Sequence, residues 1–228
     1  MIYAVIAAGG IGSRMGSELP KQYIKIGGKE IIKYTTEKFT AVSRIDNVII
    51  LCPEDWVNYT SELFNDSPSV KVIAGGATRN ETLMKAIDYI ETTDGLSEDT
   101  YLITHDAVRP FVTTDIIEKN IDAVIKYKAT GTAIPATDTI FESKNKENIT
   151  FIPDRSVLFQ AQTPQCFEAL RLRELYNSLS ESEKEILTDA CKIYTMKGYD
   201  VRLVEGHVSN IKITYPHDLI VAEAILNV

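Results

Sequence analysis

The sequence predicts an α/β protein: one domain built on a doubly wound, mostly parallel sheet. Short apolar segments rich in β-branched residues alternate with segments whose apolar residues recur every three or four positions, which is typical of βαβ units. The length of 228 residues suits a single domain of this class. Its 44% hydrophobic and 25% charged residues exclude a disordered or fibrous chain.

The elements follow one another in a regular order along the chain. We expect strands at Ile2–Ala8, Asn47–Cys52, Val70–Ala74, Thr100–Thr104 and Thr130–Pro135. We expect crossover helices at Lys29–Phe39, Asp55–Phe64, Thr78–Ile90 and Asp115–Tyr127. Further on, the pattern predicts a helix at Ser182–Lys197, a strand at Asp200–Val204 and a helix at Pro216–Leu226. Ligands of such sheets bind beyond the carboxyl ends of the strands, so we expect the site in those loops.

The pattern changes between residues 138 and 162, where a β-hairpin arm is predicted. The strand-like segments Thr139–Phe141 and Thr150–Ile152 flank a polar turn at Ser143–Asn148, and Val157–Phe159 is strand-like again. An isolated hairpin is at best marginally stable in water. The arm therefore packs either on its own domain or on a second subunit, and the pattern alone favours neither.

Charge and cysteine content exclude several classes of protein. The net charge of −8 argues against nucleic acid or an anionic membrane as partner, because both are bound through clustered Lys and Arg. No apolar run approaches the roughly 20 residues of a membrane helix. Cys52, Cys166 and Cys191 lie too far apart for a disulfide framework or a zinc site. We therefore expect a cytoplasmic protein.

A glycine-rich loop follows the first expected strand. It reads Ala7-Ala8-Gly9-Gly10-Ile11-Gly12-Ser13-Arg14-Met15-Gly16 and is followed by Pro20-Lys21-Gln22. Its backbone N–H groups could approach phosphate oxygens. The loop lacks the Gly-Lys-Ser/Thr of a Walker A motif, and Met15 stands where a dinucleotide fingerprint needs glycine. Arg14 and Lys21 suit a triphosphate, although spacing alone is equally compatible with two cations that face solvent.

The loop resembles the signature of nucleoside-diphosphate-sugar pyrophosphorylase-like enzymes, and its Pro-Lys-Gln form is similar to the cytidylyltransferase family. Further matches follow in the order of that family and cover nearly the whole chain: Gly75–Thr82, Thr104–Pro110, Asp138-Thr139, Asp154-Arg155, Gln162–Gln165, Thr188–Ala190 and Asn210–Thr214. The resemblance implies a Rossmann-like nucleotidyltransferase fold. It also implies a magnesium-dependent transfer of CMP from CTP to an alditol phosphate, with release of pyrophosphate.

Two branches of the family share these motifs. One acts on 2-C-methyl-D-erythritol 4-phosphate in isoprenoid synthesis, and the other acts on D-ribitol 5-phosphate in teichoic-acid or capsule synthesis. Val108 and the segments Gln160–Gln165 and Asp189–Ile193 are more similar to the ribitol branch. D-ribitol 5-phosphate is therefore the expected acceptor, with 2-C-methyl-D-erythritol 4-phosphate as the alternative.

Matched residue by residue, the resemblance implies a complete site. Arg14 and Lys21 would stabilise the transition state, and Arg155 and Lys212 would place the acceptor phosphate. The nucleotide would be enclosed by Ala7, Ala8, Gly9, Gly10, Gly12, Gly75, Gly76, Ala77, Thr78, Arg79, Asn80, Glu81 and Thr82, with groups around Gly76 and Thr82 reading cytosine. The acceptor would be bound by Asp106, Arg109, Thr139, Arg155, Thr163 and Lys212.

The resemblance also implies a metal ion and a partner. Asp106 would help to hold Mg²⁺ or another divalent cation. Thr139 and Arg155 lie on the expected arm, so the chain would form a homodimer in which each arm completes the neighbouring site.

The expected chemistry requires no general base, because a phosphate monoester is mostly dianionic at neutral pH. His105, His207 and His217 are therefore not expected to be catalytic. A nicotinamide-binding oxidoreductase is a competing interpretation, opposed by Met15 and by Cys52-Pro53 where a ribose-binding acid is needed. A catalytically silent nucleotide-binding homologue is another, and it would be expected to lack Arg14, Lys21 or Lys212, all of which are present.

Overall fold

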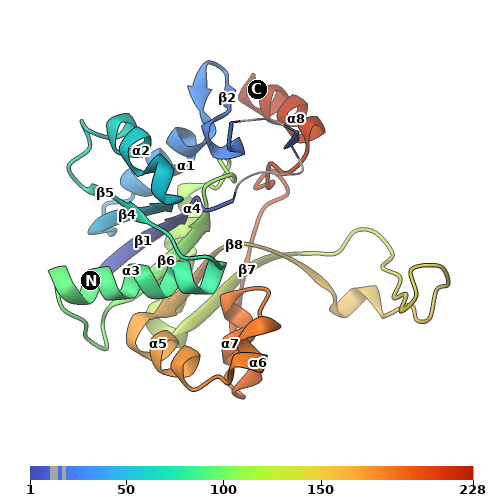
Figure 1. Cartoon of the computed structure of the whole chain (residues 1–228). Coiled ribbons are helices and arrows are strands. Elements are labelled where there is room, and N and C mark those ends of the chain that lie inside the picture. Colours follow the sequence, from blue (N-terminus) through green and yellow to red (C-terminus); the bar gives the residue numbers. More distant parts are fainter. Residues whose placement is uncertain (11–14, 17–18, 228) are drawn as a thin grey trace.

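The computed structural model of the chain describes residues 1–10, 15–16 and 19–227, and it has the predicted α/β architecture (Figure 1). One central sheet runs through it with the strand order β5-β4-β1-β6-β8-β7-β9. These strands are β1 Ile2–Ala7, β4 Asn47–Cys52, β5 Val70–Ala74, β6 Tyr101–Asp106, β7 Ala129–Pro135, β8 Phe159–Glu168 and β9 Arg202–Glu205. A short antiparallel ribbon, β2 Lys25–Ile26 and β3 Lys29–Glu30, lies apart from the sheet.

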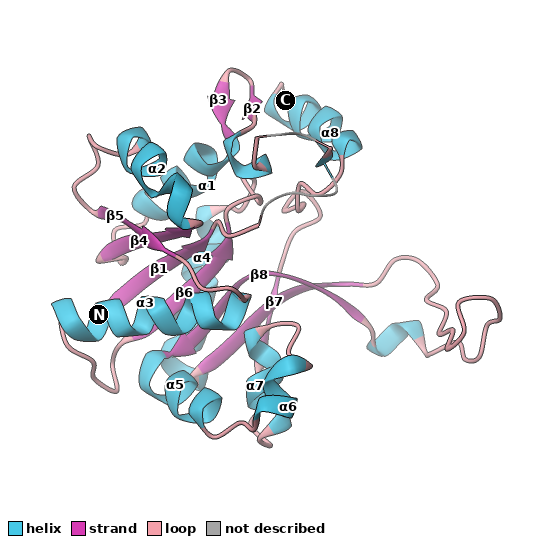
Figure 2. Ribbon diagram, viewed as in Figure 1, coloured by secondary structure: helices cyan, strands magenta, loops and turns pink. Residues whose placement is uncertain are grey.

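Helices cover both faces of the sheet (Figure 2). They are α1 Ile31–Thr40, α2 Val57–Leu63, α3 Arg79–Thr93, α4 Thr114–Tyr127, α5 Ala169–Asn177, α6 Glu181–Glu185, α7 Ala190–Met196 and α8 Pro216–Leu226. No helix within the described ranges is both long and apolar enough to span a lipid bilayer.

Strand β1 shows how the two cores arise. Its residues point alternately to opposite faces, as the period of two in a strand requires. Ala4 and Ile6 pack in the core that includes α1 and α4, whereas Tyr3 and Val5 pack in the core that includes α3, α5 and α7. Because β1 is buried on both faces, it is almost continuously apolar, which made it the easiest strand to predict.

Strand β8 is the main departure from the predicted topology. It runs antiparallel to both β6 and β7, whereas β1 pairs in parallel with β4 and β6. The sequence did not predict β8, because proline and several glutamines are unusual in a central strand. Pro164 is tolerated because the β7–β8 register shifts between Gly131 and Ala133, so Pro164 lies in an irregular part of the ladder.

Two helical predictions also need correction. The helix predicted at Ser182–Lys197 is two helices, α6 and α7, because Asp189 begins the second by accepting a hydrogen bond from the Lys192 N–H at 3.0 Å. Helix α5, directly after β8, was not predicted at all. The other helices begin within two residues of their predicted positions.

The predicted arm projects from the sheet between β7 and β8, but it is not a regular hairpin (Figure 1). The segments Thr139–Phe141 and Thr150–Ile152 do not form strands, and a single antiparallel bridge joins Glu142 to Phe151. Arg155–Val157 is a turn of 3₁₀ helix. A two-stranded hairpin is at best marginally stable unless a third strand or a helix packs against it. No strand of the described sheet lies beside this segment.

Candidate active site at the carboxyl ends of the central strands

A cavity of about 370 Å³ opens at the carboxyl ends of β1 and β6, where the topology predicts a ligand site. Its volume lies within the range of small-molecule sites. The described residues that line it are Ala7, Ala8, Gly9, Gly10, Lys21, Gln22, Gly76, Ala77, Thr78, Arg79, Thr82, Asp106, Ala107, Val108 and Lys212. The predicted Gly12 and Arg14 lie outside the described residues.

The loop before α3 forms one wall of this cavity. Thr78 begins the helix by accepting the Glu81 N–H at 3.1 Å, and the Thr82 hydroxyl accepts the Gly76 N–H at 3.0 Å. An added Cβ at Gly76 would lie 2.6 Å from the Glu81 Cβ, so only glycine fits this turn. The Ala77 N–H donates to the Glu81 carboxylate at 3.0 Å. The N–H groups of Gly76 and Ala77 are therefore used within the loop itself.

Lys21 and Gln22 line the same cavity as the end of β1. Lys21 is only 8% exposed, and its Nζ donates to the Ile213 carbonyl at 3.0 Å. The Gln22 side chain donates to the Ala8 carbonyl at 2.6 Å and so fixes the end of β1. Sequence reasoning assigned no role to Gln22, although its place beside Lys21 in the motif was a usable signal.

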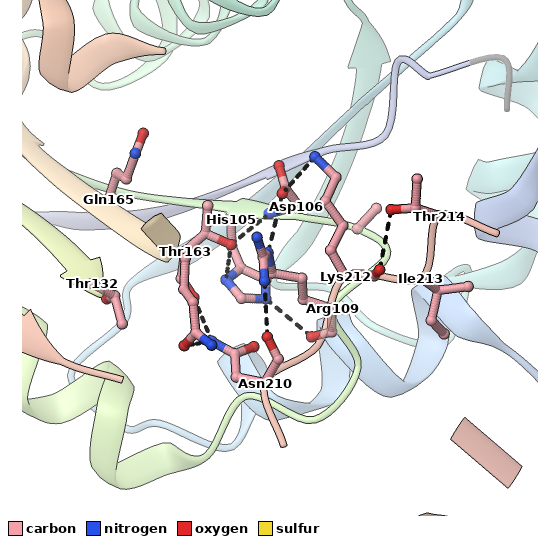
Figure 3. Close-up of polar contacts among 12 residues, drawn as sticks. His105, Asp106, Arg109, Thr132, Thr163, Gln165, Asn210, Lys212, Ile213 and Thr214 are labelled. Carbon is pink, nitrogen blue, oxygen red and sulfur yellow. Dashed lines mark hydrogen bonds and ion pairs between the residues drawn. The ribbon is translucent and has the colours of Figure 1, made fainter. Parts of the chain in front are cut away.

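Asp106 is the centre of a cluster of cations (Figure 3). Its carboxylate pairs with Arg79, with Arg109 Nε at 3.2 Å and with Lys212 Nζ at 3.0 Å. Burial alone would raise the pKa of Asp106, but the three positive charges outweigh burial and hold that pKa well below its usual range. Asp106 is therefore ionised, and the cluster keeps a net positive charge.

His105 lies behind the cluster with no exposed surface. Burial lowers the pKa of His105 to about 3, so the ring is neutral near pH 7. Its Nε2 lies 3.1 Å from the Arg109 carbonyl, and Nδ1 lies 2.9 Å from the Thr163 hydroxyl. Because a carbonyl only accepts, Nε2 carries the proton and Nδ1 accepts from Thr163. His105 thus joins the Arg109 backbone to the Thr163 side chain.

A second, smaller cavity of about 160 Å³ adjoins the first and shares Arg79, Asp106 and Lys212 with it. Two of the predicted acceptor-binding residues, Arg109 and Thr163, line this second cavity. Gln162, Gln165, Thr188 and Asp189 line it too, and sequence reasoning gave them no role although they lie in matched motifs. The two compartments meet at the cation cluster.

The structure does not bring every predicted residue to these cavities. Thr139 and Arg155 lie on the arm and line neither cavity, and Arg155 Nη1 donates to the Thr137 carbonyl at 2.8 Å. Asn80 and Glu81 line a separate depression against α6, and Gly75 does not line the main cavity. Within one chain, the predicted nucleotide and acceptor contacts are therefore only partly assembled.

A divalent cation fits one part of this site. Among the described residues, no group of three or more His, Cys, Asp or Glu side chains could enclose a metal ion. Asp106 is the one carboxylate among the described residues of the main cavity. Mg²⁺ is commonly bound by one or two carboxylates together with substrate phosphates. The residues present therefore suit a metal ion that arrives with a polyphosphate.

A family model and several solved structures similar to this chain all describe the same kind of enzyme. The family model described as IspD, 2-C-methyl-D-erythritol 4-phosphate cytidylyltransferase, matches residues 2–228. The 4-diphosphocytidyl-2C-methyl-D-erythritol synthase of Anaerococcus prevotii is similar, with 28% identity, a TM-score of 0.82, and coverage of 100% of this chain and 96% of the other.

Two further solved structures of enzymes of this kind are also similar to the chain. The 2-C-methyl-D-erythritol 4-phosphate cytidylyltransferase of Francisella tularensis has 27% identity and a TM-score of 0.82, with 98% of each chain covered. The enzyme of the same description from Thermus thermophilus has 25% identity and a TM-score of 0.76, with 100% of each chain covered.

Proposed function

The chain belongs to the IspD family of cytidylyltransferases, and from this we propose that it transfers CMP from CTP to the phosphate of a small alditol phosphate and releases pyrophosphate. The observation that carries the proposal is the charge of the main cavity, where, among the residues that the structure describes, Lys21, Arg79 and Lys212 face one carboxylate, Asp106. This surplus of positive charge complements a triphosphate. A divalent cation held by Asp106 and the phosphates would neutralise more of the negative charge of the triphosphate.

The reaction follows from these charges. An oxygen of the acceptor phosphate attacks the α-phosphorus of CTP, the bond to the β-phosphate oxygen breaks, and the electron pair leaves with pyrophosphate. No proton moves, so the protein has to position two anions in line and stabilise the charge that develops on the leaving group. We assign charge stabilisation to Lys21 and Arg14, and placement of the acceptor phosphate to Lys212.

The loop before α3 supports CTP as the nucleotide. Cytosine carries an amino donor at position 4, where uracil carries a carbonyl acceptor. The N–H groups of Gly76 and Ala77, which could otherwise donate to a uracil carbonyl, are already bonded within the loop. A site of this kind rejects the wrong base because it leaves buried polar groups unpaired.

The comparisons favour 2-C-methyl-D-erythritol 4-phosphate as the acceptor, which was the alternative in the sequence analysis. The matching family and the similar structures are described by that substrate. D-ribitol 5-phosphate is the second candidate, since Val108, the residue typical of the ribitol branch, lines the main cavity and is 6% exposed. Val108 packs there against the apolar cluster of Ile26, Ile31 and Ile213.

A pyrophosphate-release assay with CTP and Mg²⁺ tests both acceptors. We expect kcat/KM to be roughly 10- to 200-fold higher with 2-C-methyl-D-erythritol 4-phosphate, because one methyl group in a pocket is worth about 1–3 kcal/mol. Replacing CTP with UTP serves as the base control and should cost about 10²-fold. A preference for ribitol phosphate would make the second candidate correct, and release with neither acceptor would refute the proposed reaction.

The exposed arm supports a homodimer. It carries Ile140, Phe141, Ile149, Phe151, Ile152 and Val157, all of which are exposed. Exposed apolar side chains concentrated on one projecting segment are typical of a protein interface. We propose that two copies associate through their arms, and that each arm brings Thr139 and Arg155 to the acceptor side of the neighbouring site.

Mixed dimers test whether the arm completes the neighbouring site. If it does, combining Arg155→Ala subunits, which should bind the acceptor weakly, with Lys21→Ala subunits, which should turn over slowly, should restore activity in one of the two sites of each mixed dimer. The reason is that the Lys21→Ala chain still supplies Arg155 to a site that retains Lys21. Pyrophosphate release from co-refolded mixtures should then approach a quarter of the wild-type rate at a one-to-one ratio. Mixtures with no more activity than their parents would show that each arm serves its own subunit.

A further inference from the structure

The side chain of Gln162, on β8, binds the backbone of His207 in the segment after β9. Gln162 Nε2 donates to the His207 carbonyl at 2.9 Å, and the His207 N–H donates to Gln162 Oε1 at 3.3 Å. Asn210 Nδ2 donates to the same Oε1 at 3.2 Å and to the Thr163 carbonyl at 2.8 Å. Gln162 is 6% exposed and Asn210 is fully buried, so water does not compete for these bonds.

Gly206 makes this contact sterically possible. A Cβ built at Gly206 would overlap Oε1 of Gln162 and would lie 3.0 Å from Cγ2 of Thr132. The backbone of Gly206 is outside the left-handed region, so glycine is required here by packing and not by conformation. Gly206 is itself held by its N–H, which donates to the Ala133 carbonyl at 2.9 Å.

The contact fixes a segment that has no helix or strand of its own between Gly206 and Tyr215. Arg109 Nη1 donates to the Asn210 carbonyl at 2.8 Å, and the Ile213 N–H donates to the Val108 carbonyl at 2.9 Å. Lys212 lies between these two anchors and reaches Asp106 (Figure 3). The side chain of Lys212 is 40% exposed, so packing around it does little to set its position.

We propose that Gln162 and Gly206 form a latch, and that this latch positions Lys212 for the acceptor phosphate. Gln162 lines the second cavity together with Lys212, but its amide is engaged by the His207 backbone and by Asn210, so we assign it to positioning and not to contact with the reacting atoms. The proposal rests on the proposed function, in which Lys212 binds the acceptor phosphate. A displacement of about 1 Å in such a group can cost roughly 10²-fold in rate, which makes the latch important for turnover.

The test compares Gln162→Ala, Gly206→Ala and the double variant. We expect each single variant to raise the KM for the alditol phosphate roughly 10- to 100-fold while the KM for CTP changes less than about twofold. The double variant should resemble Gln162→Ala alone, because the methyl group at position 206 no longer meets the glutamine oxygen. Hydrogen–deuterium exchange over residues 206–214 should rise in all three variants, and this second measurement does not depend on activity.

Controls separate positioning from general damage. Gln160→Ala removes an exposed glutamine from the same strand and should leave both KM values and the exchange unchanged. Gln162→Met keeps the length of the side chain but has no amide. It should therefore raise the acceptor KM and the exchange as Gln162→Ala does. A destabilisation that comes only from the smaller alanine side chain would be absent from this variant.

Two results would overturn the latch: unchanged exchange over residues 206–214 in Gln162→Ala, or single-variant effects that simply multiply in the double variant. If the wild-type protein used no alditol phosphate but the exchange still rose as expected, the proposed function would be wrong and the latch would stand.

Discussion

The Lys21→Ala protein should release pyrophosphate at least about 10²-fold more slowly than the wild type at saturating CTP and acceptor. Losing one charge-stabilising group at a developing anion costs roughly 3 kcal/mol of transition-state stabilisation. Lys21 is suited to that role because it is nearly buried, lines the main cavity and is held by the Ile213 carbonyl. The measurement is kcat from a continuous pyrophosphate assay, with circular dichroism to show that the fold is intact.

Lys25→Ala is the matched control for this experiment. Lys25 lies four residues further along the chain, its side chain is 61% exposed, and it pairs with the buried Glu30 at 3.3 Å. Its removal should change kcat by less than about twofold, because Lys25 lines neither cavity. Near-normal turnover in Lys21→Ala would remove Lys21 from the proposed mechanism. The sequence predicts the same loss for Arg14→Ala, although Arg14 lies outside the described residues.

The Asp106→Asn protein should lose about 3–5 kcal/mol of unfolding free energy, since removing one partner of a buried charge cluster leaves the others uncompensated. Asp106 is 5% exposed, and its carboxylate is shared by Arg79, Arg109 and Lys212. Without it, three cations would face one another. Urea denaturation followed by circular dichroism gives the free energy, and pyrophosphate release should fall in the same variant.

Asp122→Asn provides the comparison for Asp106→Asn. Asp122 pairs with Arg44 at 2.6 Å, and its side chain is 72% exposed. The same chemical change there should cost less than about 1 kcal/mol, because water screens the pair. Equal costs in the two variants would mean that the charge of Asp106 does not hold the cluster together.

The sequence predicted those elements in which one physical signal dominates. Strands β1 and β4 are buried on both faces and therefore almost entirely apolar. Helices α3 and α4 follow Thr78 and Thr113, whose hydroxyls accept the N–H groups of Glu81 and Ile116. Strand β8 was missed because its polar residues face partners that only the fold supplies. Gln162 is an example, since its amide is satisfied by the His207 backbone 45 residues away.

The candidate site was predicted through motif resemblance. The structure shows which of the predicted residues lie together. Lys21, Arg79, Asp106 and Lys212 line one cavity, although they come from four separate parts of the chain. The roles of Gln22, Gln162 and Asn210 were not predicted, because a side chain that binds a distant backbone group leaves no periodic signal in the sequence.

The bond between Lys21 and the Ile213 carbonyl spans 192 residues. The entropy cost of joining chain segments rises with the number of residues between them, and contacts of this kind slow folding. During synthesis the glycine loop and β1 leave the ribosome long before residue 213 is made. The nascent chain can thus build much of its sheet while Lys21 and Asp106 still lack partners from the 206–214 segment. The cavity is consequently incomplete until residue 213 is made, and its cation cluster can form only when nearly the whole chain is available for folding.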